Sequence, residues 1–162
     1  MLACAAMTEP ETIAEEPLAG ETAQQLIATL NAELLARYPG PEDTFFALSE
    51  EEVSPGRGAF LVARHGGRPV GCGAVRRLDA GTVEIKRMYV AAEARGRGLG
   101  GRILAALEAE ARRLGADTLV LETGDRQPEA VALYTRAGFV RIPRYGQYAC
   151  APQSVCFGKK LG

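Results

Sequence analysis

The feature that most constrains this chain is a glycine-rich turn between an extended run and a helical pattern. Residues 82–90 are rich in β-branched and aromatic side chains, residues 95–102 contain four glycines and three arginines, and an amphipathic pattern starts at Leu99. The first amides of a helix have no partner within it, and with the positive end of the helix dipole they favour an anion. Glycines let a diphosphate approach the backbone because they lack a Cβ atom. The sequence therefore predicts a phosphate-binding loop.

Two common phosphate-binding patterns fit this loop poorly. A Walker P-loop requires Gly-Lys-Ser/Thr, whereas an arginine follows Gly101. Gly96, Gly98 and Gly101 do spell the dinucleotide fingerprint G-x-G-x-x-G, and Glu122 lies about where its ribose ligand is expected. In that fold, however, the first glycine follows the strand almost directly, while residues 91–95 intervene here. A nucleotide-binding protein is therefore the weaker alternative.

Two ordered motifs resemble those of the GNAT superfamily of N-acetyltransferases. The first is the loop itself, which fits that family's motif A as Arg95-x-x-Gly98-x-Gly100. The second resembles motif B with glutamine in place of the family's asparagine, and reads Gln127-x-x-Ala130-x-x-Leu133-Tyr134-x-x-x-Gly138-Phe139. The resemblance covers residues 57–161 and, more loosely, the strand and helix expected before them.

The resemblance implies acetyl-CoA as co-substrate and direct transfer of its acetyl group, in a ternary complex, to a primary amine of a small molecule or peptide. Met88 and Tyr89 would flank the pantetheine arm, and the Val90 N–H would be an oxyanion donor to the thioester carbonyl. The loop amides would hold the pyrophosphate, and Arg97 or Arg102 would also meet the 3′-phosphate. The residues expected to bind the cofactor are Met88, Tyr89, Val90, Arg95, Gly96, Arg97, Gly98, Leu99, Gly100, Gly101, Arg102 and Gln127. A non-catalytic acyl-CoA-binding or regulatory module is the alternative.

Glu84 is the general base that the resemblance implies. A carboxylate of ordinary pKa is a weak base for an ammonium group unless its surroundings raise that pKa. Strand alternation places Glu84 on one face with Lys86, Met88 and Val90. A cross-strand salt bridge to a neighbour such as Arg76 or Lys86 is an equal alternative role for this carboxylate.

Tyr134 is the expected acid, because the family places a tyrosine there that protonates the departing CoA thiolate. Its neighbours on the helix face are apolar, so a core aromatic is the alternative. Tyr145 and Tyr148 lie in the loop before the last strand and would either line the acceptor pocket or pack that loop onto the body. Acidic residues in 42–58 indicate either a cationic amine or basic peptide as acceptor, or a solvated loop.

The order of patterns predicts an α+β domain with a mixed, mostly antiparallel sheet and helices on both faces. Three strands separated by turn signals form a meander, and a crossover helix leads to a strand parallel to the last of them. The resemblance adds three layers and a sheet that splays at the cofactor site. A short helical or extended piece is expected near Phe45 to Leu48. The expected strands are 11–18, 59–64, 69–78, 82–90, 118–122, 139–142 and 154–160, and the expected helices are 20–38, 99–114 and 127–137.

Length and composition limit the remaining possibilities. The 162 residues suit one domain, 11–162, after a tail at 1–10 that we expect to be disordered. The net charge of −1 gives no bulk bias toward nucleic acid, and no apolar run approaches the ~18 residues of a membrane span. We therefore expect a cytoplasmic protein without nucleic-acid or membrane partners. Four cysteines without C-x-x-C spacing and one histidine predict no metal site. The fold also allows a homodimer through the C-terminal strands.

Overall fold

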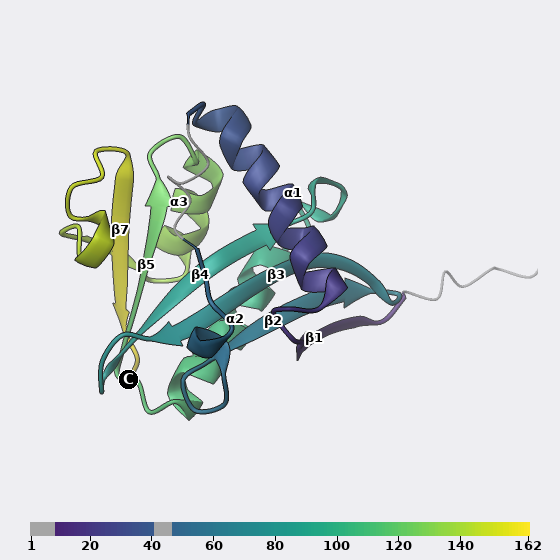
Figure 1. The fold of residues 1–162 in the computed structure, drawn as a ribbon, viewed down its shortest axis with the longest axis horizontal. Helices are drawn as coiled ribbons and strands as arrows, with labels where there is room; N and C mark the ends of the chain where they lie inside the picture. Colours follow the sequence, from purple (N-terminus) through teal and green to yellow (C-terminus); the bar gives the residue numbers. More distant parts are fainter. Residues whose placement is uncertain (1–8, 41–46) are drawn as a thin grey trace, which may run out of the picture.

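The computed structural model describes residues 9–40 and 47–162. In these ranges the chain forms one open sheet with helices on both faces (Figure 1). The strands are β1 (Glu11–Glu15), β2 (Gly58–His65), β3 (Arg68–Arg77), β4 (Thr82–Val90), β5 (Thr118–Gly124), β6 (Val140–Ile142) and β7 (Ser154–Lys160). They lie in the order β1-β2-β3-β4-β5-β7-β6. The α-helices of the described residues are α1 (Glu21–Arg37), α2 (Leu99–Arg113) and α3 (Pro128–Arg136).

These elements confirm the predicted α+β class. The bounds of β4 and β7 agree with the predicted ranges, and the other elements differ from theirs by a few residues at their ends. The piece predicted near Phe45 to Leu48 begins outside the described residues, and a 3-10 turn at Glu51–Val53 follows it. Most of the predicted tail also lies outside the described residues. Within them, no helix is long and apolar enough to cross a membrane.

The sheet opens between β4 and β5, its one parallel pair among the described strands. Residues Thr82 to Ile85 of β4 pair with Thr118 to Leu121 of β5, and the pairing stops there. β4 nevertheless runs on to Val90, and β5 to Gly124. The far ends of the two strands therefore leave main-chain groups and side chains facing a gap, which is the splay that the resemblance implied.

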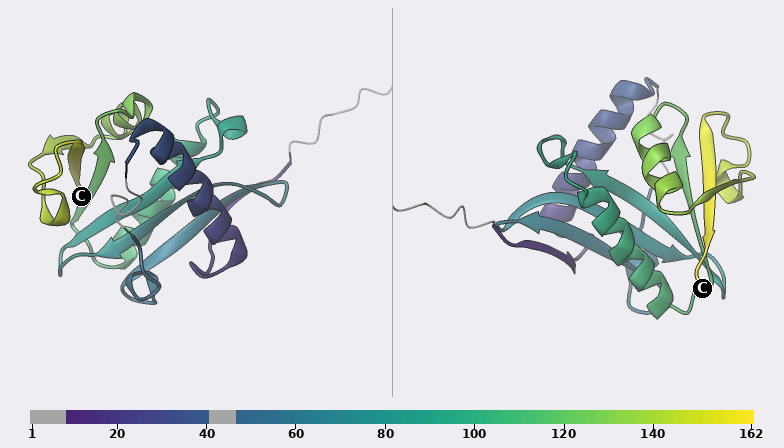
Figure 2. Two further views of the ribbon diagram at one scale, coloured as in Figure 1. Left: turned by 45° about the horizontal axis from the view of Figure 1, so that its top comes forward. Right: turned by 180° about the vertical axis from the view of Figure 1, so that it is seen from behind.

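Two apolar cores cover the two faces of the sheet. The inner side of α2, including Ile103, Leu104 and Leu107, packs with α3 against one face. α1 packs against the other face through Leu26 and Leu30. Figure 2 shows α2 and α3 in front of the sheet when it is viewed from behind, with α1 beyond it. This arrangement gives the three layers and brings α1 and α3 to opposite sides of the gap.

A bulge in β4 changes which side chains share a face. Ala74 of β3 lies opposite Lys86, whereas Cys72 lies opposite Tyr89, so β4 holds one more residue than β3 in this stretch. The bulge is at Arg87, whose φ is 57°. The prediction that Met88 and Val90 share a face with Glu84 is therefore wrong: both pack against the α2 core, on the opposite side from Tyr89 and α1. An extra residue reverses the alternation beyond it.

Candidate active site

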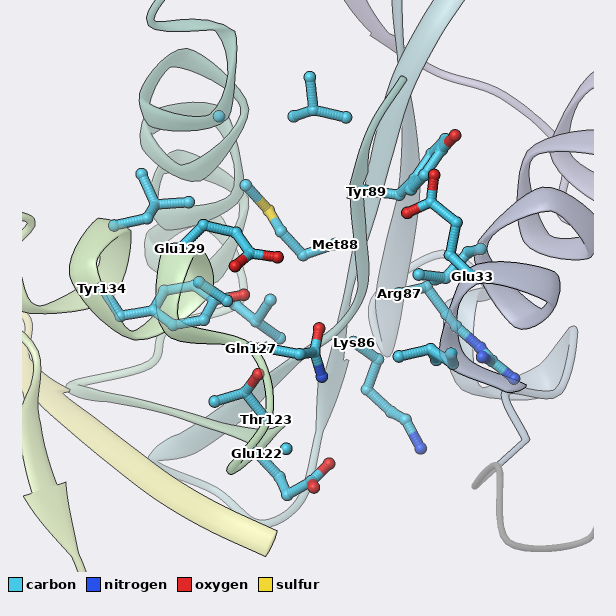
Figure 3. Close-up of a pocket in the computed structure, with 18 of the residues that line it drawn as sticks. Glu33, Lys86, Arg87, Met88, Tyr89, Glu122, Thr123, Gln127, Glu129 and Tyr134 are labelled. Carbon is cyan, nitrogen blue, oxygen red and sulfur yellow. The ribbon is translucent and has the colours of Figure 1, made fainter. Parts of the chain in front are cut away.

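A pocket of about 1030 Å³ fills the gap between the diverging ends of β4 and β5. Its walls come from α1, β4, β5, α3, the glycine loop and the segment before β7. In Figure 3, Met88 leaves β4 toward α3, while Lys86, Arg87 and Tyr89 leave it toward α1. The bulge thus divides the β4 wall of the pocket into two sides of different composition.

The glycine loop forms the wall of the pocket at the start of α2. Gly98 is the N-cap of α2 with φ 78°, and Gly96 has φ 79°, conformations that suit residues without a Cβ. No side chain caps the helix, so the first amides of α2 are left for another acceptor. A Cβ on Gly100 would lie 3.2 Å from Leu133 Cδ2 of α3, which explains a third glycine. The loop has the free donors and the access that an anion requires.

Two of the three arginines of this loop are held by glutamates. Arg95 lines the pocket and donates from Nη2 to both carboxylate oxygens of Glu33 in α1, at 2.8 and 3.0 Å. Arg97 and Arg102, which the sequence predicted as cofactor contacts, do not line the pocket. The guanidinium of Arg102 donates to the carboxylate of Glu11 in β1, at 2.6 and 2.8 Å. The contacts left for an anion at this end are therefore mainly those of the backbone.

The remaining predicted cofactor residues gather around the same pocket. Gln127 lies immediately before Pro128, the first residue of α3, and faces the gap from the side opposite β4 (Figure 3). β4 contributes the three residues at its unpaired end. The predicted residues that line the pocket are Met88, Tyr89, Val90, Arg95, Gly96, Gly98, Leu99, Gly100, Gly101, Gln127 and Tyr134. Their cofactor contacts stay predictions, but the fold places them together.

Tyr134 extends from α3 into the pocket wall and is only 5% exposed. Its ring packs edge-on against Phe139 at 5.9 Å between centroids, and also lies close to Phe157. Burial, and to a lesser degree the charge of Glu122, raise the pKa of the Tyr134 phenol above its usual value. The phenol is protonated at neutral pH, as an ordinary phenol also is, and the raised pKa makes it a weaker acid, so its role as proton donor stays a prediction. The role as an acid and the alternative role in the core are compatible in this position.

Glu84 is fully buried and does not line the pocket. Its register partner on β3 is Arg76, whose Nε donates to Oε1 at 2.7 Å. The Tyr145 hydroxyl donates to the other oxygen, Oε2, at 2.5 Å. Arg76 also forms an ion pair with Glu52. The cross-strand salt bridge, which was the alternative role of Glu84, is present, and its role as a general base stays a prediction.

Glu122 is a carboxylate that does line the pocket. It lies on β5 just beyond the last residue that pairs with β4, and the Ser154 hydroxyl donates to its Oε1 at 2.9 Å. Burial raises the pKa of its carboxyl group, although Ser154 and the charge of Lys86 act in the opposite direction. Sequence reasoning considered Glu122 only as a ribose ligand. Its position at the end of a predicted parallel strand was the available signal.

The loop before β7 contributes both packing and pocket wall. The rings of Tyr145 and Tyr148 meet edge to face at 5.3 Å between centroids, and Tyr148 lines the pocket. Arg144 donates to the Ser154 and Pro152 carbonyls and so ties the loop to the sheet. The loop therefore packs onto the body and places Tyr148, but not Tyr145, at the pocket, and a contact with the acceptor stays a prediction. Among the described residues, Cys72, Cys150 and Cys156 are free thiols, and no cluster of three or more metal-ligating side chains is present.

The model of the acetyltransferase (GNAT) family matches residues 24–139, which is well over half of the chain. The chain belongs to the GNAT family. Its enzyme class is therefore acyltransferase. The match begins in α1 and ends directly after α3, so it includes the glycine loop, the β4 bulge and the gap between β4 and β5.

Similar proteins support this GNAT assignment over nearly the whole length. The "IAA acetyltransferase" of Azospirillum brasilense is 38% identical over 151 residues, which are 93% of this chain and 97% of that protein. A "putative acyl-CoA N-acyltransferase" structure from Klebsiella pneumoniae superposes with a TM-score of 0.82 at 35% identity, covering 94% of this chain and 98% of its own. A GNAT family acetyltransferase from Elizabethkingia anophelis, with acetyl-CoA bound, shares the fold with a TM-score of 0.69 at 20% identity over 93% and 98% of the chains.

Proposed function

We propose that this GNAT enzyme transfers the acetyl group of acetyl-CoA to a primary amine of a small molecule or peptide, by direct attack within a ternary complex. The observation that carries the proposal is that one pocket is lined both by the amide-rich glycine loop and by the carboxylate of Glu122. A cofactor and an acceptor can therefore occupy it together, with the unpaired end of β4 between them.

The glycine loop accounts for the cofactor half of the proposal. Its uncapped helix start offers N–H groups to the pyrophosphate, as expected for a diphosphate at a helix N-terminus. The extended pantetheine arm would run beside Met88 and Val90, on the α3 side of β4. Gln127 faces the same side, and Arg95 would reach a phosphate by exchanging its contact with Glu33. Arg97 and Arg102 stay predicted contacts of the 3′-phosphate.

The chemistry requires one proton acceptor and one proton donor. The neutral amine nitrogen attacks the thioester carbonyl carbon, the C–N bond forms, the C–S bond breaks, and the ammonium proton passes to a carboxylate. Tyr134 would then protonate the CoA thiolate. Glu84 is the base predicted from the sequence. Glu122 is the second candidate, favoured because it lines the pocket while both oxygens of Glu84 are already bonded.

Two measurements test this function. Calorimetric titration with acetyl-CoA, free CoA and NAD should show binding of both CoA species and none of NAD, and a preference for NAD would contradict the proposal. Release of free thiol should then be measured with amino acids, polyamines, aminoglycosides and peptides. At least one amine should be acetylated, and Tyr134→Phe should lower its kcat by about 100-fold or more without weakening acetyl-CoA binding. Turnover that survives both Tyr134→Phe and the loss of each carboxylate would refute the assigned mechanism.

The alternative is a GNAT-fold protein that binds acyl-CoA without catalysis. Tight binding of acetyl-CoA together with no thiol release from any amine of the panel would favour it. The raised pKa of Glu122 in the pocket wall argues for catalysis, because structural carboxylates in ion pairs commonly have lowered values. Glu11 and Glu16, each bonded to an arginine outside the pocket, illustrate that lowered state in this chain.

A further inference from the structure

Arg87 has a backbone conformation that sets it apart from the other residues of the pocket wall. It lies at the β4 bulge with φ 57°, the one non-glycine residue of the described ranges with a positive φ. The thiol of Cys72 donates to its carbonyl oxygen at 3.3 Å and helps to hold the bulge. A left-handed conformation is costly for a residue with a Cβ atom and is concentrated at functional sites. The bulge turns the Arg87 side chain toward α1, into the pocket wall (Figure 3).

The guanidinium of Arg87 is incompletely satisfied. Its Nη1 donates to Oδ1 of Asn31 in α1 at 2.8 Å, but its buried Nε has no acceptor in the part of the chain that the structure describes. No carboxylate of the described residues forms an ion pair with it. Burial lowers the pKa of Arg87, and Cys72 and Tyr148 are the groups that oppose this effect. Arg87 as a whole is half-buried, and a cation that is partly removed from water without an anionic partner is unfavourable unless a ligand supplies the partner.

Two other arginines of the pocket wall, unlike Arg87, have a carboxylate partner. Arg95 is bonded to Glu33, and Arg37 forms an ion pair with Glu129. These two pairs neutralise the cations that Arg37 of α1 and Arg95 of the glycine loop bring to the pocket wall. At the bulge a second basic side chain lies beside Arg87, because Lys86 precedes it on the same side of β4 and also lines the pocket. Burial lowers the pKa of Lys86 to about 8, so the ammonium form still predominates at neutral pH.

A carboxylate on β5 lies across the gap from the basic side chains of β4. Glu122 on β5 is near enough to Lys86 for the ammonium to lower the pKa of its carboxyl group. Figure 3 shows both side chains extending to the same end of the gap, below Gln127. The acceptor end of the pocket thus presents a cation from β4 and a carboxylate from β5. This arrangement is complementary to a molecule that has an amine at one point and an anionic group at another.

We propose that the acceptor is a small amine that also carries a carboxylate, which Arg87 binds while the amine lies toward Glu122. The inference rests on the proposed acetyltransferase function and names its acceptor class. The planar guanidinium suits a carboxylate better than a point charge would, because it can donate two parallel hydrogen bonds. Two of the three acidic residues at 50–52 are already neutralised, since Glu51 is paired with Arg57 and Glu52 with Arg76.

Matched acceptors test the proposal. Free-thiol release is measured at saturating acetyl-CoA with the twenty L-amino acids and with their primary amides, which differ only in the carboxylate. The amine of the amide is less basic, so a larger fraction of it is neutral and able to attack at the assay pH. A preference for the acid therefore indicates that the enzyme recognises the carboxylate. For the best acceptor, kcat/KM of the acid should exceed that of its amide by about tenfold or more, as expected for a hydrogen-bonded charge.

The same pair is then measured with Arg87→Met and with Arg113→Met. Arg113 is an exposed residue of α2 paired with Glu110, so it is a control for loss of a positive charge. Arg87→Met should raise KM for the acid about 10- to 100-fold and change the amide by about twofold at most. Arg113→Met should change neither, and Arg87→Lys should retain part of the preference. The acid-to-amide ratio is taken within one sample, so partial unfolding of a variant cancels from it.

The outcomes separate the two proposals. Equal or better use of the amide, or turnover confined to amines without an anionic group, would overturn the acceptor class and leave the acetyltransferase function standing. An acid preference that Arg87→Met preserves would overturn the assignment to Arg87. No thiol release with any amine of the panel would overturn the proposed function, and the acceptor class with it.

Discussion

The two ends of the pocket, one at the glycine loop and the other at Arg87 and Glu122, differ in how their charged side chains are paired. At the end proposed for the cofactor, the side chain of Arg95 is paired with Glu33, and the first amides of α2 are uncapped. At the end proposed for the acceptor, Arg87 has no ion-pair partner among the described residues, and Glu122 of β5 lies near Lys86. Under the proposed function, the backbone would recognise one ligand and individual side chains the other. Backbone recognition suits a cofactor that is always the same, whereas side chains suit an acceptor that differs between enzymes.

The largest effect should come from the carboxylate at the acceptor end. Glu122→Gln should lower kcat about 100- to 10,000-fold if Glu122 accepts the amine proton. Its pKa is raised by burial, so the rate should fall, as pH decreases through that raised pKa, at higher pH than for an ordinary glutamate near 4.5. The profile of kcat/KM against pH measures this limb. Glu84→Gln is the matched comparison, and if it alone abolishes turnover, Glu84 is the base instead.

A β-branched side chain in the glycine loop should selectively weaken the binding of acetyl-CoA. Gly98→Val places a Cβ where φ is 78° and where it would lie 3.0 Å from Arg102 Nη1. We expect acetyl-CoA binding to weaken about 10- to 100-fold, the equivalent of a strained backbone residue. Calorimetry gives the affinity. Gly67→Val is the control, because Gly67 has φ 81° in the β2–β3 hairpin, away from the pocket. An equal loss in the control would show that global strain caused the effect.

Asn31 offers a finer test of the acceptor end. Its Oδ1 accepts the hydrogen bond from Arg87 Nη1, so it positions the guanidinium from α1. Asn31→Ala should raise KM for a carboxylate-bearing acceptor about 3- to 10-fold, because one hydrogen bond to a charged group is lost. KM for acetyl-CoA and for the amide acceptor should stay unchanged in steady-state assays. A matching rise for the amide would mean that Asn31 shapes the pocket rather than orienting Arg87.

The smallest effect should come from an ion pair outside the pocket. Glu11→Gln removes the contact with Arg102 that joins β1 to the first turn of α2. The pair is largely exposed, so the loss in free energy of unfolding should be below about 1 kcal/mol at low salt. The hydrogen bond from Arg102 lowers the pKa of Glu11, so this stabilisation is present above about pH 4.5 and is lost as the pH falls through the lowered value. Urea unfolding at pH 7 and pH 3 measures both points.

The glycine loop could be predicted from the sequence because the residues that indicate it lie close together in the chain. Glycines with positive φ, a helix pattern beginning at Leu99 and a preceding β-branched run all lie within about twenty residues, so the loop could be predicted without knowledge of the fold. The strands were equally local, since each has turn residues at its ends. Tyr134 was found through motif B rather than through its apolar helix face, which by itself indicates only burial.

The part of the pocket around Arg87 could not be predicted from the sequence, for two physical reasons. A bulge at an arginine has no sequence signature, because arginine does not favour positive φ, and the rule of alternation therefore placed Met88 and Val90 on the wrong face. Contacts between distant segments were also hidden. Nothing near Glu84 in the sequence reveals that Tyr145 donates to it, or that Arg87 meets α1. Such contacts depend on how the elements pack, which a single sequence does not state.

The β4 bulge has a consequence for how such an enzyme diversifies. Because the extra residue turns position 87 toward α1 and positions 88 and 90 toward α3, a point mutation at 87 leaves the cofactor wall untouched. Duplicated genes could exchange that one codon and try new acceptors while each copy still binds the shared co-substrate. Substitutions that change the substrate range would then accumulate on the α1 side of β4. Residues on its α3 side would change slowly.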